Sequence, residues 1–597
     1  MNLLQSNHNK PGDKILHRLF IRAELSYSVS HLSKAVGPII DMLFVSQFIG
    51  VNGVTVLGYV GPLILLFELI GITIGTGTRT KGAALMGEGR KEDANKAFSS
   101  SLISGGGIAI IVVLIVAVLN MQAAFLLGAR EPELQQMTVQ YLYGYLIGVP
   151  FCGLTRIITP YLQMEGQFKL INITGILTTV IDVVADGIVI FVLHGGMFEI
   201  GLATSLGYII PFILCISFFF RNKKKKSVFR FSFKYFDLGL SLEMLKLGAP
   251  GGLRKGFGAI GGMLINNMFT AMNMRYLVAA YGVFSQITTF IRTSWYGPAD
   301  TLHAFASAFI GEEDKESIKE VQKVAVKHSL IATSVLTVLL FVFAPVLAAI
   351  FLKSDDPEEI RMTIECIRVS CISLVFCSVV YNFNNYLIAV KRLAFSTIYG
   401  FLIECGTIVP ITFLSLNLIG YQGAWIAKII NMIALCLIAV LYIHLNKTGK
   451  TFREKMLFLP ENFGVPPEDE LDEIAGSIEE IKDLSRIAVA FALEHGASRK
   501  RAMQYGLITE ELAGILAEHG FSDGKPHNIN ARLVAKNEDL MIRMRDDCKA
   551  FNMTEYYNLI MESQDPEKDT GFAIVMKLSR DVKYSFTFGA NNLIVRV

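Results

Sequence analysis

Long apolar segments recur between residues 28 and 444 of this 597-residue chain and stop near Asn446. Each is long enough for the ~20 residues that carry a helix across ~30 Å of hydrocarbon. We count about twelve segments, and only 18% of all residues are charged, at a mean hydropathy of +0.46. The sequence before Asn446 therefore predicts an all-α polytopic membrane domain, and the sequence after it predicts a separate water-soluble domain.

Basic residues are distributed unevenly between the loops that join these segments. One set of loops is nearly bare, and the other carries Arg79, Lys81, Arg90, Lys91, Arg221, Lys223 to Lys226, Lys315, Lys319, Lys391 and Arg392. By the positive-inside rule, this asymmetry predicts a cell-membrane protein with both termini in the cytoplasm. Termini on the same side of the membrane require an even number of spans, and twelve satisfies this. A topology anchor explains the run 223–226 better than binding of acidic lipid does, and we expect no nucleic-acid partner.

Two glycine-containing segments repeat along the apolar part with one spacing. Gly58 and Gly282 are separated by 224 residues, and so are Gly87 and Gly311, which begin two charged loops. This pattern predicts two six-helix repeats, parallel because both loops fall on the same predicted membrane side. The expected divisions are a cytoplasmic segment 1–25, an N-lobe 26–222, a basic loop 223–240, a C-lobe 241–445, a linker 446–475 and a soluble domain, the tail, 476–597.

Ionisable residues inside the apolar segments are the first site candidates, because each costs ~2.5–3.5 kcal/mol on insertion scales. They are Asp41, Glu68, Arg156, Asp182, Asp186, Arg292, Asp300, Glu404 and Lys428. Asp182 and Asp186 are four residues apart and share a helix face, so they need a shared proton or a cation between them. Arg292 and Asp300 either pair with each other or lie at the water-exposed end of their helix.

Three stretches resemble the multidrug and toxic compound extrusion (MATE) family: IIDMLFVSQFIG with Asp41, GEGRKEDANKAF after the second span, and DVVADGIVIF with Asp182 and Asp186. The likeness covers about residues 20–445. It implies a secondary antiporter, not an enzyme, that exports small amphipathic or cationic organic compounds across the lipid bilayer by alternating access. It also implies an oxygen-lined N-lobe pocket, completed by Thr204, for Na⁺ or H⁺ as the coupling ion.

The family usually has an amide where this chain has Asp182, and a second acid favours proton coupling without excluding Na⁺. In the second repeat, Asp41 corresponds to Ile265, whereas alignment of Gly201 with Gly423 makes Asp182 correspond to Glu404. The coupling site is therefore predicted in the N-lobe, with Glu404 as a weaker candidate.

Two alternative functions remain open. A lipid-linked glycan flippase of the same superfamily would need a cavity rich in arginine and lysine, for which the chain offers Arg156, Arg254, Lys255, Arg292 and Lys428. A membrane-tethered regulator would use the tail to bind an anti-sigma-type partner.

The segment after Asn446 first gathers Pro460, Pro466 and Pro467, which predicts a linker. Apolar residues at helical spacing then predict helices over about 478–491 and 503–520, and INARLVA, DLMIRMRD, YSFTF and LIVRV predict strands. We expect an α+β domain with helices on one face of a mixed sheet.

These tail segments resemble the histidine-kinase-type ATP-binding fold, in its anti-sigma-factor or serine-kinase branch. The likeness covers about residues 475–597. It implies that Glu511 acts as a catalytic base, that Asp546 accepts a hydrogen bond from the adenine amino group, and that Gly571 leads a helix N-terminus toward phosphate.

Three positions depart from the ATP-binding pattern. The Mg²⁺ ligand position holds Ile515, which cannot ligate a hard cation. Cys548 and Asp569 stand where glycines are usual. We therefore expect nucleotide binding without turnover, or docking of a cytosolic protein, rather than ATPase or kinase activity.

Overall fold

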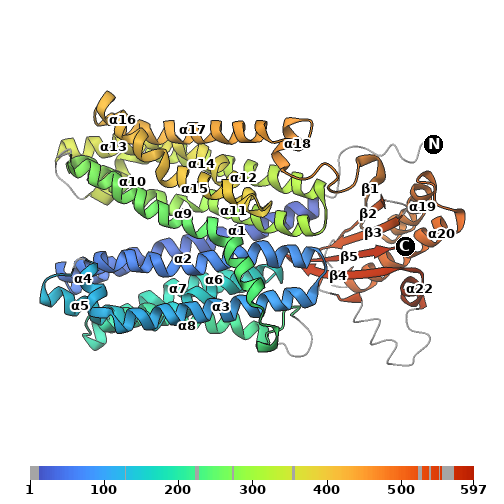
Figure 1. Ribbon diagram of the computed structural model, residues 1–597, viewed down its shortest axis with the longest axis horizontal. Coiled ribbons are helices and arrows are strands. Elements are labelled where there is room, and N and C mark those ends of the chain that lie inside the picture. Colours follow the sequence, from blue (N-terminus) through green and yellow to red (C-terminus); the bar gives the residue numbers. More distant parts are fainter. Residues whose placement is uncertain are drawn as a thin grey trace.

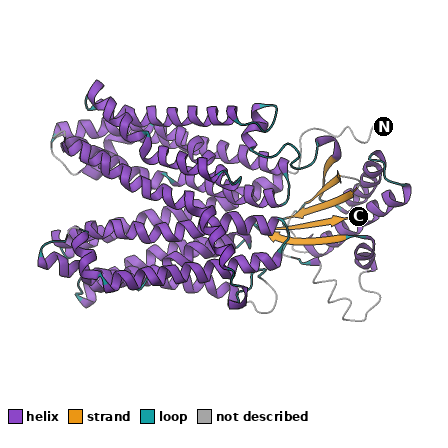
Figure 2. Ribbon diagram, viewed as in Figure 1, coloured by secondary structure: helices purple, strands orange, loops and turns teal. Residues whose placement is uncertain are grey.

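Two bundles of long helices lie side by side, with a small domain of helices and strands across one end of both (Figures 1 and 2). The computed structural model describes residues 13–127, 129–221, 227–271, 275–352, 356–521, 527–536, 539–549, 551–553 and 570–597. The basic run 223–226 and Asp569 lie outside these residues.

The N-lobe contains eight helices that pack around α2 and α7–α8. They are α1 (Asp13–Phe48), α2 (Val51–Gly87), α3 (Lys91–Val118), α4 (Asn120–Leu126), α5 (Pro132–Leu146), α6 (Val149–Met164), α7 (Phe168–Ile188, continued by a π-helical turn Val189–Leu193) and α8 (Met197–Arg221). Their outer faces are apolar: on α3, Ile110, Ile111, Leu114 and Ile115 are all exposed. Such a surface is stable in lipid and not in water.

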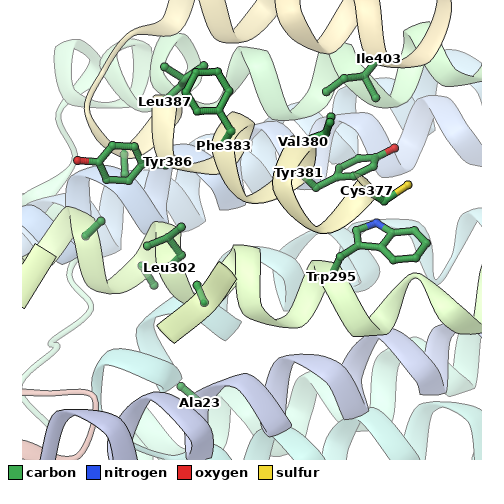
Figure 3. Packing of buried hydrophobic residues seen from close by; sticks show 14 of the residues in the cluster. Ala23, Trp295, Leu302, Cys377, Val380, Tyr381, Phe383, Tyr386, Leu387 and Ile403 are labelled. Carbon is green, nitrogen blue, oxygen red and sulfur yellow. The ribbon is translucent and has the colours of Figure 1, made fainter. Parts of the chain in front are cut away.

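The C-lobe repeats this plan. It contains α9 (Leu238–Ala271), α10 (Arg275–Ile291), α11 (Thr293–Gly311), α12 (Lys315–Leu352), α13 (Pro357–Cys371), α14 (Ser373–Ala389), α15 (Leu393–Phe401, continued by a π-helical turn Leu402–Gly406), α16 (Ile408–Ile419) and α17 (Gln422–Leu445). Figure 3 shows its core, where Trp295 of α11 lies against Tyr381 of α14. The rings of Trp295 and Tyr381 stack with centroids 6.0 Å apart.

Seven helices in the described part are long and apolar enough to cross a membrane, or nine if two bent pairs, α5–α6 and α13–α14, are each one span. Three further rods, α1, α9 and the adjoining pair α10–α11, run along the same bundles without meeting that criterion (Figure 1). The nine spans and these three further rods together make twelve, the number of segments expected from the sequence.

The lobes meet near the tail through a reciprocal contact of α2 and α11. A Cβ on Gly87 would lie 2.0 Å from the carbonyl oxygen of Ala308, and a Cβ on Gly311 would lie 2.1 Å from that of Ala84. Gly87 and Gly311, and likewise Ala84 and Ala308, are separated by the spacing of 224 residues found in the sequence. Glycine admits this approach of the two backbones, as it does at other membrane helix crossings.

The tail is an α+β domain whose five strands form one sheet in the order β1-β2-β3-β5-β4. Its elements are β1 (Glu470–Ala475), α19 (Ile478–Glu494), α20 (Arg499–Gly520), β2 (Ile529–Lys536), β3 (Asp539–Asp546), α22 (Thr570–Leu578), β4 (Asp581–Thr587) and β5 (Ala590–Arg596). The helices cover the sheet on the side away from the bundles (Figure 1).

Two details of the tail differ from expectation. All described strand pairs are antiparallel, so the sheet is not mixed. The segment 446–475, expected as a linker, contains the short helix α18 (Phe452–Leu457) and the edge strand β1. The strand was missed because its acidic residues, such as Glu470 and Asp472, resemble a solvated linker; they pair with Arg532 on the neighbouring strand.

Candidate functional site: an acidic cluster, a central cavity and the tail junction

Three carboxylates from two helices meet inside the N-lobe. Asp41 lies on α1, Asp182 and Asp186 lie on α7, and one oxygen from each lies within 4.8 Å of the others. Asp186 is fully buried, and neither of its oxygens accepts a hydrogen bond from a described residue. Three acids this close cannot all be ionised unless a cation lies among them. The cluster can therefore hold a proton or a small hard cation such as Na⁺.

Small residues bring α1 and α8 close to Asp182. A Cβ on Gly37 of α1 would lie 3.5 Å from Asp182 Oδ2, and one on Gly207 of α8 would lie 3.3 Å from Asp182 Cβ. Thr204 of α8 is buried, and its hydroxyl is within hydrogen-bonding reach of Asp182. The structure thus brings together the four N-lobe residues singled out in the sequence; their part in coupling stays a prediction.

Glu404 lies apart from this cluster, in the C-lobe. It belongs to the π-helical turn Leu402–Gly406 and lines a cavity of about 410 Å³, where it accepts a hydrogen bond from the Tyr381 hydroxyl at 3.1 Å. π-helical turns often occur at functional sites. The location of Glu404 is that of a cavity-lining group, distant from the three N-lobe acids.

A cavity of about 420 Å³ lies between the lobes, and a second of about 410 Å³ lies in the C-lobe, where Leu65 is the one N-lobe residue in its described wall. Residues from α1, α2 and α6 of the N-lobe and from α9, α11 and α14 of the C-lobe line the first. Both cavities share Arg254, Lys255, Arg292 and Tyr296 in their walls, so they adjoin one another. Each volume is in the range of ~300–1,000 Å³ typical of small-molecule sites.

A polar network joins the lobes at the wall of the first cavity. Asp300 of α11 accepts from Arg79 of α2 at 3.1 Å and lies 3.0 Å from Nε2 of His31 on α1. The Asn385 side chain donates to the same carboxylate at 3.3 Å. Sequence reasoning missed this network, because Arg79 was assigned to a loop.

One assignment made from the sequence is wrong here, and one of the two alternatives for Asp300 and Arg292 does not occur. Arg79 and Lys81 lie within α2 and not in a loop. Asp300 pairs with Arg79, and no ion pair between Asp300 and Arg292 occurs among the described residues. The charge of Arg292 therefore faces the cavities without that partner.

In the tail, Glu511, the expected base, and Gly571, expected near phosphate, lie beside each other. A Cβ on Gly571 would lie 1.9 Å from Glu511 Oε2, so the carboxylate of α20 occupies the space beside the start of α22. Ile515 is 6% exposed and packs in the tail core. Its alkyl side chain faces the core of the tail.

Asp546, the expected adenine partner, is fully buried at the end of β3. One oxygen accepts from Asn591 Nδ2 at 2.7 Å and from the Cys548 amide at 3.0 Å, and burial raises the pKa of Asp546 to about 6. Nearby, ligand atoms of His527, Asp547 and Cys548 lie within 4.8 Å of one another, a group that could hold a metal ion.

Three arginines on β2 and β3 contact the loop between α11 and α12. Arg532 and Arg543 pair with Asp314, the latter at 3.3 Å, and Arg545 pairs with Glu312 at 2.7 Å. Burial opposes ionisation of Asp314, but the three guanidinium groups outweigh it and hold the pKa of Asp314 well below its usual range. These buried pairs fix the tail sheet to the C-lobe.

The turn between β4 and β5 reaches both lobes. Its two residues, Phe588 and Gly589, have φ of 56° and 86°, as a two-residue type I′ hairpin turn requires. The Phe588 ring stacks on Phe305 of α11 at 4.2 Å, and its N–H donates to the carbonyl oxygen of Met164, at the end of α6, at 2.8 Å. A Cβ on Gly166 would lie 2.7 Å from Gly589 Cα, so the N-lobe contact is backbone against backbone.

Comparison with known proteins gives related sequences along the membrane domain. The multidrug export protein MepA of Staphylococcus saprophyticus is 24% identical over 428 residues, covering 71% of this chain and 92% of the relative. The probable multidrug resistance protein YoeA of Bacillus subtilis is 21% identical over 334 residues, covering 55% of this chain and 72% of the relative.

Solved structures share the fold. A Vibrio cholerae MATE transporter, VcmN, superposes with a TM-score of 0.67 at 16% identity, covering 74% of this chain and 99% of that one. A MOP superfamily transporter from Pyrococcus furiosus, described by a reversed polarity of its binding pocket, superposes with a TM-score of 0.66 at 18% identity, covering 73% and 98%. The sequence profile of the MatE family matches residues 28–188 and 260–414, which is more than half of the chain. The chain belongs to the MatE family.

Proposed function

We propose that this chain is a cation-coupled antiporter that exports small organic compounds by alternating access. Its family is one of secondary transporters, not enzymes, and the related sequences are named as multidrug export or resistance proteins. The observation that carries the coupling is the buried cluster of Asp41, Asp182 and Asp186, whose oxygens lie within 4.8 Å. Such a cluster changes its repulsion each time it gains or loses a cation.

Helix α1 connects this cluster to the central cavity. It carries Asp41 near one end and, closer to the tail, Tyr27 and His31 in the cavity wall. It packs against α7, the helix of the other two acids, and against α11 of the C-lobe. Neutralising the acids lets α1 approach α7, which changes the cavity and thereby the affinity for substrate.

Protons are the coupling ion that this cluster favours. One Na⁺ among three carboxylates would leave two buried negative charges uncompensated, which is costly in a low-dielectric interior. At least one proton must then be present even with Na⁺ bound. Coupling by H⁺ alone needs no further ligand.

Transport into proteoliposomes under separate H⁺ and Na⁺ gradients tests this proposal. Asp41→Asn and Asp186→Asn should each abolish gradient-driven transport at an unchanged protein level, because each removes one of the three carboxylates whose mutual repulsion changes on cation binding. Asp93→Asn, at the surface-exposed start of α3, is the matched control and should transport normally. Gradient-driven transport that survives in both cluster variants would contradict the assignment.

For the tail, we propose a docking role that controls separation of the lobes. The Phe588–Gly589 turn touches α6 and α11, and the arginines of β2 and β3 hold the α11–α12 loop. Opening of the bundle at this end moves the lobes apart, so the tail must first leave one of them. The core position of Ile515 and the bond between Asp546 and Asn591 favour this role over nucleotide turnover.

A further inference from the structure

The two adjoining cavities are lined by more cationic than acidic side chains. Six cationic residues line one or both: Arg79, Arg156, Arg254, Lys255, Arg292 and Lys428. Three acids accompany them: Glu68, Asp300 and Glu404. Two of these acids are already paired, Glu68 with Arg156 and Asp300 with Arg79. The remaining four cations have no carboxylate within ion-pair distance in the part of the chain that the structure describes.

Aromatic rings, instead of carboxylates, surround two of these cations. The Arg254 guanidinium lies 5.5 Å from the ring centroid of Tyr296 and 5.3 Å from that of Tyr381, and its buried Nη1 has no hydrogen-bond partner among the described residues. Lys428 Nζ lies 4.0 Å from the ring centroids of both Tyr281 and Phe284. Ring faces compensate a desolvated cation only in part, so an anion that enters the cavity gains a charge-assisted partner.

The other two cations are available to a ligand in both cavities. Lys255 is exposed and lines both cavities, and Arg292, which lines both as well, donates to the Thr289 hydroxyl at 3.3 Å. The wall of the second cavity adds Trp295 and the rings around Lys428, which suit an apolar body. The site thus combines a cationic centre with aromatic walls.

We propose that the central cavities bind an amphipathic organic anion, with a carboxylate or phosphate at Arg254, Lys255 and Arg292 and an apolar body against the rings. This inference rests on the proposed transport function and names its substrate class. It departs from the cationic compounds expected from the family resemblance. The anionic group can belong to a free drug-sized compound or to a lipid headgroup, and volumes near 410 Å³ fit one such group and not a long glycan.

Membrane energetics agree with an anionic substrate. Export of an anion moves negative charge out of the cell, which the inside-negative membrane potential favours. Export of a cation by the same cavity would require it to sit beside four unpaired positive charges and to move against that potential.

Binding and transport of two probes test the proposal with the purified full chain. Fluorescein serves as the organic anion and ethidium as the cation, and fluorescence anisotropy in nanodiscs measures binding independently of transport. We expect fluorescein to bind at least tenfold more tightly than ethidium. Lys255→Gln and Arg292→Gln should each weaken fluorescein binding by about tenfold, because each removes a charge-assisted contact. The matched control, Lys447→Gln, removes an exposed lysine outside the cavities and should change nothing.

A double variant sharpens the test, since Lys255→Glu with Arg292→Glu should reverse the preference in favour of ethidium. Equal or tighter binding of ethidium by the unaltered chain, or fluorescein binding that neither glutamine variant weakens, overturns the proposal. In proteoliposomes, uptake of fluorescein identifies a free anion, and flipping of fluorescently labelled phosphatidylglycerol identifies a lipid headgroup. If fluorescein binds as expected but neither probe nor lipid moves under any gradient, the transport proposal fails and the binding inference stands.

Discussion

Replacing Phe588 by asparagine separates the two roles of the turn between β4 and β5. As a turn residue, phenylalanine is a poor choice, because a bulky side chain at positive φ is strained. Asparagine followed by Gly589 is the preferred pair for such a turn. As a docking residue, Phe588 supplies the ring that stacks on Phe305, which asparagine cannot replace. The variant should therefore fold its tail at least as well and dock it less well.

The structure sets the size of the effect. Phe588 is 3% exposed, and its ring lies 4.2 Å from that of Phe305. Burying a phenylalanine side chain contributes about 1.5–3 kcal/mol, and an aromatic pair adds about 0.5–1.5 kcal/mol. A loss of about 3 kcal/mol shifts the docking equilibrium by about two orders of magnitude, since about 1.4 kcal/mol corresponds to a factor of ten.

Hydrogen exchange measured by mass spectrometry on the full chain in nanodiscs reads this shift. The amide of residue 588, which donates to Met164, and the end of α11 should exchange faster in Phe588→Asn, while β2 and β3 stay protected. Phe452→Ala, at an exposed phenylalanine of α18, is the control and should leave both regions unchanged. Unaltered exchange at residue 588, or a parallel increase through the whole tail, would refute the docking argument.

Three further substitutions test other contacts. Asp314→Asn removes the buried carboxylate that Arg532 and Arg543 share across the junction, at a cost of about 3–5 kcal/mol, and should release the tail, seen as faster tryptic cleavage of residues 446–475; unchanged cleavage would argue against the ionic tie. Gly311→Val directs a side chain at the carbonyl oxygen of Ala84, which lies 2.1 Å from the Cβ position. The variant should shift spin-label distances between α2 and α11 toward the separated state. A wild-type distance distribution would count against the close contact of α2 and α11. Burial raises the pKa of Asp546 to about 6, so its protonated form stabilises the tail. This contribution is fully present below the unfolded pKa of about 3.9 and is lost as pH rises through about 6. Asp546→Asn should therefore flatten the fall in tail melting temperature between these pH values, and an equally steep fall in the variant would contradict this origin.

The N-lobe acids could be placed from the sequence because their chemistry follows from local spacing. Helical periodicity puts Asp182 and Asp186 on one face, and the family likeness added Asp41 and Thr204. The partner of Arg79 could not be placed this way, because it depends on how the two lobes face each other across the cavity. Hydropathy also could not show that α2 continues past Arg79, since a charge buried by a distant helix has the same local sequence as one exposed in a loop.

The tail illustrates a second limit. Its secondary structure followed from periodicity, but the strand β1 was hidden by acidic residues whose partner, Arg532, lies on another strand. Nothing in the sequence around Phe588 distinguishes a turn residue from one that contacts the membrane domain. Such contacts join segments hundreds of residues apart, where no short-range pattern exists.

The reciprocal glycine contact of α2 and α11 has a mechanical consequence. Its two halves, Gly87 with Ala308 and Gly311 with Ala84, are copies of each other, so neither is a weaker point at which parting of the lobes could begin. Packed surfaces of this kind have discrete arrangements and do not deform continuously. The contact of α2 and α11 should therefore open as a unit. At this end the two lobes then have two stable arrangements, joined and separated, and no stable intermediate between them.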